Sequence, residues 1–357
     1  MAAVPGPAPA PSASVAGDAA PVIHVHRLCK YYRVYQKQPG LLGSLRGLVR
    51  RTYREVRAVE DVSFDIYAGE LVGFLGPNGA GKTTTLKVLS GLLYPTSGRV
   101  SVLGYDPWKR QPEFQRQFSL VLGQKNQLWW DLPAIETFVL NKEIYGVPDG
   151  QFRRTLDELV ELLDLERTLY VQVRKLSLGE RMKCELAAAL LHSPRVLFLD
   201  EPTIGLDVVM QQRIRDFIKE YNRRHGATIL LTSHYMDDVK ELCRRVIIIN
   251  HGRLIYDGRL DEIVRRYADW KVLLAVFEQP VERARLEEFG EVVSYEPLQA
   301  AIRVPRSEIA ARTGRLLAEL PVLDVTIQET EVEDVIRRIF GGTADADAAA
   351  PASAGAT

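Results

Sequence analysis

The stretch at residues 76–84 has the residue types needed to hold a row of phosphates. It reads Gly-Pro-Asn-Gly-Ala-Gly-Lys-Thr-Thr, which matches the pattern GxxxxGK[ST]. In this pattern the glycines let consecutive backbone N–H groups close around the phosphates, the lysine neutralises charge, and the next hydroxyl ligates Mg²⁺. The predicted nucleotide-binding residues of this loop are Gly76, Pro77, Asn78, Gly79, Ala80, Gly81, Lys82, Thr83 and Thr84.

Two carboxylates follow an apolar run further along the chain. Residues 196–199 read Val-Leu-Phe-Leu and lead directly into Asp200 and Glu201. This pattern is typical of a buried parallel strand that delivers acids to the carboxyl edge of a sheet, where ligands bind. We expect Asp200 to hold Mg²⁺ through water and Glu201 to polarise the water that attacks a γ-phosphoryl group. The pair therefore predicts hydrolysis of the nucleotide.

A second anion site is predicted at residues 176–180, Leu-Ser-Leu-Gly-Glu, which open a helical pattern. Ser177 is a suitable N-cap, and the N–H groups at a helix start favour anions. The chain has one triphosphate loop but two anion sites, so we expect the second to cover the nucleotide of a neighbouring subunit in a symmetric dimer. The predicted contact residues are Ser177, Leu178, Gly179 and Glu180.

The elements that must position these residues follow an α/β pattern. An apolar run at 71–75 predicts the strand before the phosphate loop, and residues 84–89 predict the helix after it. Strand-like runs alternate with helical patterns up to about residue 270, which predicts a domain with a largely parallel sheet.

A different pattern follows residue 270 and predicts a small α+β domain. Its βαββαβ order is typical of a split-βαβ sandwich. The predicted strands are 272–276, 292–295, 301–304 and 323–327, the helices are 281–289 and 307–320, and a closing helix covers 332–340. The expected organisation is a disordered tail at 1–21, a first domain at 22–270, an accessory domain at 271–341 and a second disordered tail at 342–357.

The bulk composition excludes several kinds of protein. The chain has 357 residues, and its 46 basic and 46 acidic residues cancel. This balance argues against a protein that mainly coats nucleic acid, and no nucleic-acid partner is expected. The cysteines, Cys29, Cys184 and Cys243, have no metal-binding spacing. No apolar run approaches the roughly 20 residues of a membrane-spanning helix.

An insertion at 41–57 has leucines at helical spacing among arginines. It predicts a basic amphipathic helix, which either lies at a membrane surface or packs its leucines on its own domain. A second open question concerns Leu128-Trp129-Trp130-Asp131-Leu132. Its adjacent tryptophans suit a docking groove for a partner's helix, and equally suit burial among neighbouring helices.

Taken together, the chain resembles the ATP-binding subunit of an ABC transporter over residues 22–260. The resemblance rests on the phosphate loop, on Leu176-Ser177-Leu178-Gly179-Glu180, on Leu197 to Pro202, on Gly205-Leu206-Asp207 and on Thr232-Ser233-His234. It implies a phosphate-loop fold with an antiparallel β edge and a helical subdomain at about 125–190. It also implies ATP and Mg²⁺ as cofactors. The implied partners are a separate membrane permease and a second ATPase subunit, with which the chain would form a homodimer. The implied location is the cytoplasmic face of the membrane.

The resemblance further implies roles for single residues. Tyr32 is similar to the platform for adenine, although neighbouring Tyr31 is an alternative. Gln124 is similar to the lid glutamine, a ligand of Mg²⁺ and of water, and His234 to the switch histidine at the γ-phosphate. Asp207 resembles the residue that communicates across the dimer. The catalytic set is thus Glu201, His234 and Gln124, and the metal set is Thr83, Gln124 and Asp200.

The motif at 176–180 departs from the family pattern in having Leu178 where Gly is usual and Glu180 where Gln is usual. A carboxylate at 180 adds negative charge near a phosphate. The domain after 270 and the insertion resemble those of the exporter branch of the family, which includes drug/viologen-type and Na⁺-type efflux systems. The cargoes that this resemblance implies include drugs, cationic toxins and amphipathic molecules.

The alternative function is a soluble ABC ATPase that acts on nucleic acid or ribosomes. A phosphate-loop kinase is a third class of protein that carries such a loop.

Overall fold

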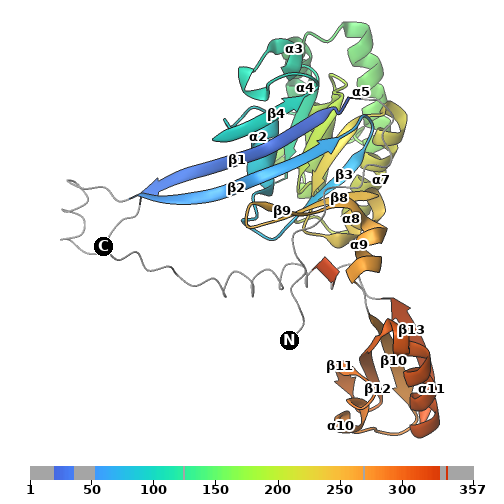
Figure 1. Ribbon diagram of the computed structural model, residues 1–357. Helices are drawn as coiled ribbons and strands as arrows, with labels where there is room; N and C mark the ends of the chain where they lie inside the picture. The colour runs from blue at the N-terminus through green and yellow to red at the C-terminus, as the bar shows by residue number, and fades with distance from the viewer. Residues whose placement is uncertain (1–19, 36–52, 124, 268–269, 330–334, 337–357) are drawn as a thin grey trace, which may run out of the picture. The chain divides into compact units, whose positions relative to one another are not determined.

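The computed structural model describes residues 20–35, 53–123, 125–267, 270–329 and 335–336. The chain forms two compact units, Met1–Gly258 and Arg259–Thr357 (Figure 1). Each unit is treated by itself below. The predicted tails at 1–21 and 342–357 fall almost wholly outside the described residues, as does most of the insertion at 41–57.

A six-stranded sheet forms the centre of the first unit. Neighbouring strands from β5 to β8 run parallel, as the sequence predicts. Every residue of β6 and β7 is buried, which explains their nearly unbroken apolar runs, since helices cover both faces of a parallel sheet. In spatial order the strands are β5 (Phe118–Leu122), β6 (Val196–Asp200), β7 (Thr228–Thr232), β3 (Leu71–Leu75), β8 (Arg245–Asn250) and β9 (Arg253–Arg259).

An antiparallel sheet forms the second layer. Its central strand β1 (Ile23–Tyr35) pairs with β2 (Tyr53–Ile66) and β4 (Ser97–Val102). Helix α2 (Lys82–Leu89) follows the phosphate loop and packs into the hydrophobic core that both sheets share. Leu86 of α2, Val59 of β2 and Phe198 of β6 all belong to this core. The short helices η1 (Pro107–Lys109) and α3 (Pro112–Gln115) lead from β4 to β5.

The predicted helix at 41–57 is wrong in the part that the structure describes. Residues 53–57 belong to β2 and pair with the end of β1, with Tyr53 opposite Tyr35 and Arg57 opposite Tyr31. Cross-strand aromatic and β-branched side chains favour this pairing over a helix. Residues 41–52 lie outside the described part of the chain.

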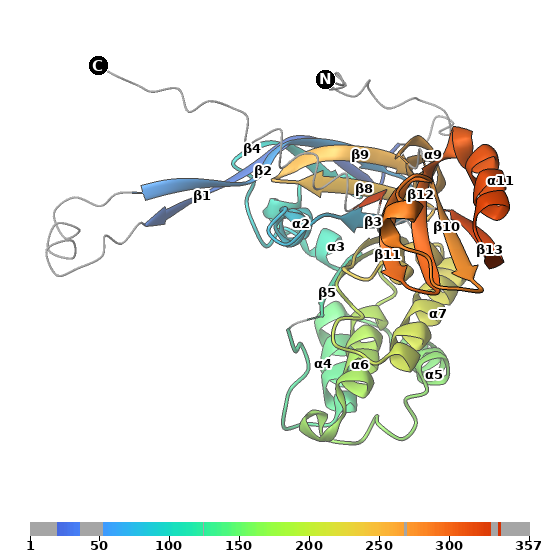
Figure 2. The same cartoon turned by 90° about the horizontal axis from the view of Figure 1, so that it is seen from below.

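The helices of the first unit divide into two groups. In Figure 2, α4, α5 and α6 lie together and well apart from β1, β2 and β4, with α7 beside α5. Helix α8 contacts α7 and β3 of the parallel sheet. Apolar residues on α5 and α6 pack these helices on each other. The bounds are α4 (Ala134–Tyr145), α5 (Asp149–Leu163), η2 (Val173–Lys175), α6 (Leu178–Leu190), α7 (Val208–His225) and α8 (Met236–Leu242).

The second unit has the predicted βαββαβ order. Its antiparallel sheet has the order β11-β12-β10-β13, and Leu286, Phe289 and Leu316 pack on one face of it. The first helix of this order, α10, is shorter than predicted: it has 4 residues, Arg283–Leu286, where the sequence predicts a helix over 281–289. The elements are α9 (Leu260–Tyr267), β10 (Trp270–Phe277), α10 (Arg283–Leu286), β11 (Glu291–Glu296), β12 (Gln299–Pro305), η3 (Arg306–Glu308), α11 (Ile309–Glu319) and β13 (Val322–Glu329). Of the predicted closing helix, only residues 335–336 are described.

Candidate nucleotide site

The phosphate loop joins β3 to α2, as the sequence predicts. Gly81 caps α2 at a φ of 105°, and a Cβ there would lie 2.3 Å from the carbonyl oxygen of Ala58, so only glycine fits. The buried Lys82 Nζ donates to the carbonyl oxygens of Gly76 (2.6 Å) and Pro77 (3.1 Å). Burial lowers the pKa of Lys82, and the charges of Glu201 and Asp200 oppose that shift. The loop thus holds a cation at the start of a helix, where anions bind.

Asp200 lies beside the phosphate loop at the carboxyl end of β6. Its Oδ2 accepts a hydrogen bond from the Thr83 hydroxyl at 2.8 Å, and its Oδ1 accepts one from the Thr232 hydroxyl at 2.7 Å. The fold therefore brings together two of the predicted metal ligands from distant parts of the sequence. Thr232 at the end of β7 is a partner that the sequence did not single out, although it belongs to the quoted motif Thr232-Ser233-His234.

Glu201 and His234 are in direct contact. Glu201 Oε1 lies 2.5 Å from His234 Nε2. Glu201 has a φ of 57°, in the left-handed region, and its backbone N–H donates to both the carbonyl and the hydroxyl of Thr232 at 3.1 Å. Two residues predicted separately thus form one acid–imidazole pair at the edge of the parallel sheet.

Gly123 links the site to the segment predicted to carry the lid glutamine. Its N–H donates to the Asp200 carbonyl at 2.8 Å, and a Cβ at this position would lie 2.1 Å from the Glu201 carbonyl oxygen. A side chain at 123 would therefore displace the backbone of Glu201. Gln124 itself lies outside the described residues, so its predicted role stays a prediction.

The motif at 176–180 caps helix α6 as predicted. Ser177 Oγ accepts the Glu180 N–H at 3.3 Å, while the Glu180 carboxylate accepts the Ser177 N–H at 2.9 Å. This reciprocal capping box satisfies two N–H groups at the helix start. The unusual carboxylate at 180 is therefore turned onto its own helix.

Asp207 caps the next helix, α7, by accepting the Met210 N–H at 2.9 Å. The start of α7 lies against the capped end of α6, where Met210 packs on Gly179 and Leu178 packs near Gly205. Val208 is 76% exposed and Val209 is 66% exposed. The two predicted inter-subunit segments thus form one surface with exposed apolar side chains.

Tyr31 and Tyr32 lie on opposite faces of the β1–β2 ribbon, because side chains alternate along a strand. Tyr31 stacks with the Arg57 guanidinium, 5.3 Å from the ring centre, and Tyr32 with Lys30 at 5.1 Å. Only one of the two rings can therefore stack on a base held at a given face of the ribbon. The structure does not decide between Tyr31 and Tyr32, so the role of Tyr32 as the adenine platform stays a prediction.

Glu185 is a buried acid on α6 that the sequence did not single out. Burial raises its pKa to about 7. The hydrogen bond from the Gln127 backbone N–H and the charge of Arg181 lower the pKa, but their effect is smaller than that of burial. The ionised form is thus disfavoured in the fold, so stability falls as the pH rises from about 4.5 to about 7. At about 1.4 kcal/mol for each pKa unit, the penalty approaches about 3 kcal/mol above pH 7.

We therefore expect Glu185→Gln to stabilise the protein at pH 8 and to leave its stability nearly unchanged at pH 4.5. Urea unfolding of both proteins at the two pH values measures the difference. An equal difference at both values would contradict the burial of an ionisable group at this position.

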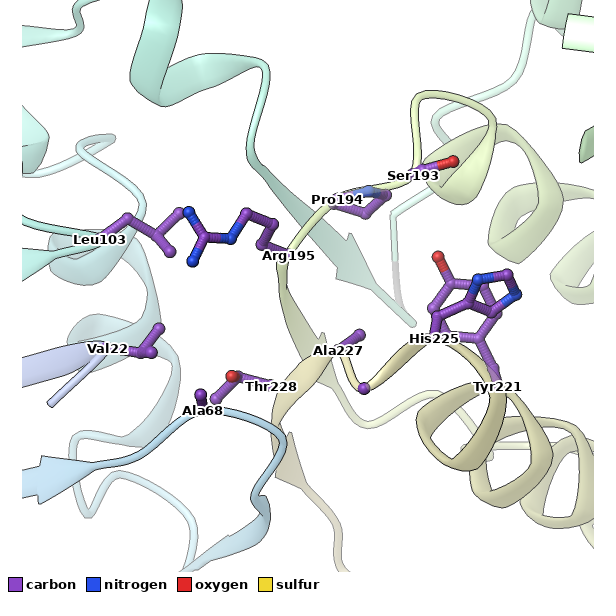
Figure 3. A pocket seen from close by; sticks show the side chains of 11 residues that line it. Val22, Ala68, Leu103, Ser193, Pro194, Arg195, Tyr221, His225, Ala227 and Thr228 are labelled. Carbon is purple, nitrogen blue, oxygen red and sulfur yellow. The ribbon is translucent and has the colours of Figure 1, made fainter. Parts of the chain in front are cut away.

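Two concavities lie away from the phosphate loop. One, of about 620 Å³, lies between β5, α4 and α6. The other, of about 210 Å³, lies at the amino ends of β6 and β7, at the edge of the sheet opposite Asp200. In Figure 3, the rings of His225 and Tyr221 lie against each other in this smaller pocket, with their centres 4.5 Å apart and their planes tilted by 33°, and Arg195 points toward Leu103. Neither concavity includes residues 76–84.

The fold and the site define a class of protein. A phosphate loop between β3 and α2, a Thr83–Asp200 pair and an acid after β6 are the parts of a phosphate-loop ATPase. The sequence pattern of the ABC transporter family matches residues 59–204, and that of the EvrA-like ABC transporter C-terminal domain matches residues 269–328. The chain belongs to the ATP-binding proteins of ABC transporters, and it binds and hydrolyses ATP as the subunit that powers a membrane permease.

Curated relatives match most of the chain. The Nod factor export ATP-binding protein I of Burkholderia pseudomallei is 34% identical over 300 residues, covering 82% of this chain and 95% of the relative. The bacitracin transport ATP-binding protein BcrA of Bacillus licheniformis is 29% identical over 296 residues, with the same coverage. The doxorubicin resistance ATP-binding protein DrrA of Mycobacterium tuberculosis is 36% identical over 223 residues, or 62% of this chain and 67% of the relative.

Solved structures share the fold of the first unit. The ATP-binding subunit of an ABC transporter matches with a TM-score of 0.57 at 29% identity and covers 69% of this chain and 93% of that one. A dimeric ATP-binding cassette bound to ADP and phosphate matches at 0.55 and 24% identity, covers 66% of this chain and 98% of that one, and shows the fold alone. Within the described residues, no helix combines the length and the apolar character needed to cross a membrane.

Proposed function

We propose that two copies of this chain close around two ATP molecules at the cytoplasmic face of a membrane permease and drive export. The observation that carries the proposal is the convergence of Thr83, Asp200, Glu201 and His234 beside the phosphate loop. In this arrangement the Glu201 carboxylate polarises the attacking water, and His234 contacts both Glu201 and the γ-phosphate. Hydrolysis then reopens the pair of subunits and resets the permease.

The residues beside the loop fit a magnesium ion. Thr83 and Asp200 present a hydroxyl and a carboxylate oxygen 2.8 Å apart, and Mg²⁺ prefers oxygen ligands together with the phosphates of its nucleotide. We propose that these two side chains, with Gln124, would hold Mg²⁺. Bound there, the ion would neutralise charge on the β- and γ-phosphates. Tyr32 is proposed to stack on adenine.

The surface around the start of α6 supports the proposed dimer. Ser177 at the capped helix end, the exposed Leu178 and the exposed Val208 share this surface with Asp207. An anion site rimmed by apolar side chains suits a second nucleotide-loaded subunit. We propose that the capped end of α6, Ser177 to Glu180, faces the partner's ATP while the Glu180 carboxylate stays on its own helix, and that Asp207 contacts the partner subunit.

The groove between β5, α4 and α6 is the proposed contact with the permease. Leu120, Thr137 and Ile144 line it, and Arg110 and Arg116 contribute cationic side chains. Beside it, the Trp129 backbone N–H lies 3.5 Å from the Thr137 hydroxyl, and Trp129 and Trp130 are 55% and 48% exposed. The alternative of tryptophan burial is thus wrong for both rings. An amphipathic permease helix with an acidic side chain fits this groove.

We expect Ile144→Glu to abolish co-purification with the permease and to leave ATP binding by the isolated subunit unchanged. Ile144 is 60% exposed at the groove, so the change places a charge in a docking surface without opening the core. Tyr170→Glu is the matched control, because Tyr170 is 73% exposed and does not line the groove. If both variants lose the permease during purification, or if both retain it, the result would contradict this docking site.

The named relatives support export as the direction of transport. Their names refer to export of Nod factor, transport of bacitracin and resistance to doxorubicin. We propose that this chain powers export of a drug-like or amphipathic molecule, and that residues 271–341 form an accessory domain. Mild-detergent purification from the native membrane tests the assignment. An integral protein should accompany the chain, whereas recovery only with ribosomes or DNA would favour a soluble ABC ATPase.

A further inference from the structure

Behind the acid–imidazole pair lies a buried carboxylate to which the sequence motifs assign no role. Resting on the roles proposed for Glu201 and His234, we propose that Asp238 is a positioning residue for ATP hydrolysis. Asp238 lies on α8 and has no exposed surface. Its Oδ2 accepts hydrogen bonds from the hydroxyls of Thr203 and Ser233, both at 2.5 Å. Thr203 follows Glu201 by two residues, and Ser233 directly precedes His234.

The third partner of Asp238 is Arg215 on α7. Its Nη1 donates to Asp238 Oδ1 at 3.0 Å, its side chain is 5% exposed, and its Nη2 donates to Gln212 at 2.8 Å. The hydroxyls of Thr203 and Ser233 thus donate to one oxygen of this carboxyl group, and the Arg215 guanidinium donates to the other. Asp238 thereby ties three segments together: the turn after β6, the turn after β7, and helix α7.

The backbone of Glu201 needs such an anchor. A non-glycine residue at a φ of 57° is strained and persists only where the surroundings hold it. On the amino side, Thr232 binds the Glu201 N–H. On the carboxyl side, the Ile204 N–H donates to the Glu201 carbonyl at 3.2 Å, and Thr203 between them is tied to Asp238. Release of Thr203 would let Glu201 relax out of this conformation.

The same carboxylate fixes the turn that carries His234. The Ser233 hydroxyl donates to Asp238 and accepts the Tyr235 N–H at 2.9 Å, so the residues on both sides of His234 are held by one group. The contact between Glu201 and His234 therefore depends on two turns that share one anchor. A displacement of about 1 Å can cost about 100-fold in rate where reacting groups must be aligned.

The test removes the two hydroxyl links separately in the full-length chain. We expect Thr203→Val and Ser233→Ala each to lower kcat by at least about 10-fold, with ATP affinity within about twofold of wild type, because an alignment defect acts on kcat. Thr203→Ser retains the hydroxyl and should restore kcat. Thr168→Val is the matched control, since Thr168 is also buried and its hydroxyl donates to the Leu165 carbonyl at 3.1 Å, within the helical part of the unit.

Each variant is assayed at the same interval below its own melting temperature. Values of kcat for Thr203→Val and Ser233→Ala that match the Thr168→Val control would overturn the proposal. Parallel losses of kcat and ATP affinity would also overturn it, because they indicate general loosening of the fold. Wild-type turnover by Glu201→Gln is a separate result that would contradict the proposed role of Glu201. The kcat values of Thr203→Val and Ser233→Ala, compared with that of Thr168→Val, would still decide the role of Asp238.

Discussion

Replacement of Glu201 by Gln is expected to lower the rate of ATP hydrolysis by at least about 100-fold, because an amide cannot act as a base at the attacking water. The side chain keeps its size, and the backbone contacts of Glu201 with Thr232 do not involve the carboxylate. ATP binding should therefore persist. Phosphate release measures the first effect, and equilibrium binding of a fluorescent ATP analogue measures the second.

The same variant should accumulate as an ATP-dependent dimer on gel filtration, because subunits that close around ATP reopen only after hydrolysis. Glu166→Gln is a suitable control, since Glu166 is exposed and belongs to the loop after α5. Normal turnover by Glu201→Gln would remove Glu201 from the mechanism. A monomer in saturating ATP would contradict the shared site and leave the hydrolytic role intact.

Replacement of Lys82 by Ala is expected to weaken ATP binding by about 10- to 100-fold, which corresponds to the loss of a charged hydrogen bond of about 1.5–3 kcal/mol. The Lys82 ammonium is buried inside the phosphate loop and donates to the carbonyl oxygen of Gly76. Its removal also leaves Asp200 and Glu201 to repel an incoming phosphate. Titration with a labelled ATP analogue measures the loss.

Lys87→Ala is the matched control for this measurement. Lys87 lies in the last turn of the same helix, α2, and is half-buried. The control should therefore bind ATP as the wild type does. Unchanged affinity in Lys82→Ala would refute the assignment of residues 76–84 as the phosphate-binding loop, whatever the outcome for Glu201.

Several parts of the fold could be predicted because each depends on neighbouring residues. The phosphate loop, its flanking strand and the capping of α6 by Ser177 are local patterns. The order of elements after residue 270 could likewise be read from alternating apolar runs. Predictions were weaker where pairing between distant segments decides the conformation. Residues 53–57 end a segment whose apolar residues have helical spacing, yet they pair as a strand with the end of β1.

Burial of single polar side chains could not be predicted in the same way. Glu185 and Asp238 stand in helical stretches where an acid is usually solvated, and only the packing of other segments shows that they are enclosed. The carboxylate of Glu180 was expected to add charge beside a phosphate, but a reciprocal hydrogen bond turns it onto Ser177. The exposure of Trp129 and Trp130 was likewise left open by their sequence.

The sequence by itself determined the chemistry of this protein: a loop for phosphates, an acid pair after a buried strand and a capped helix suited to a second nucleotide. These features depend on residue type and short spacing, which the chain carries without folding. Only the tertiary structure decided which groups act together. Thr83 meets Asp200, Glu201 meets His234, and Asp238 holds the two turns behind them. The physical reason is that parallel strands bring distant segments to one edge of a sheet, where hydrogen bonds between them are set by geometry.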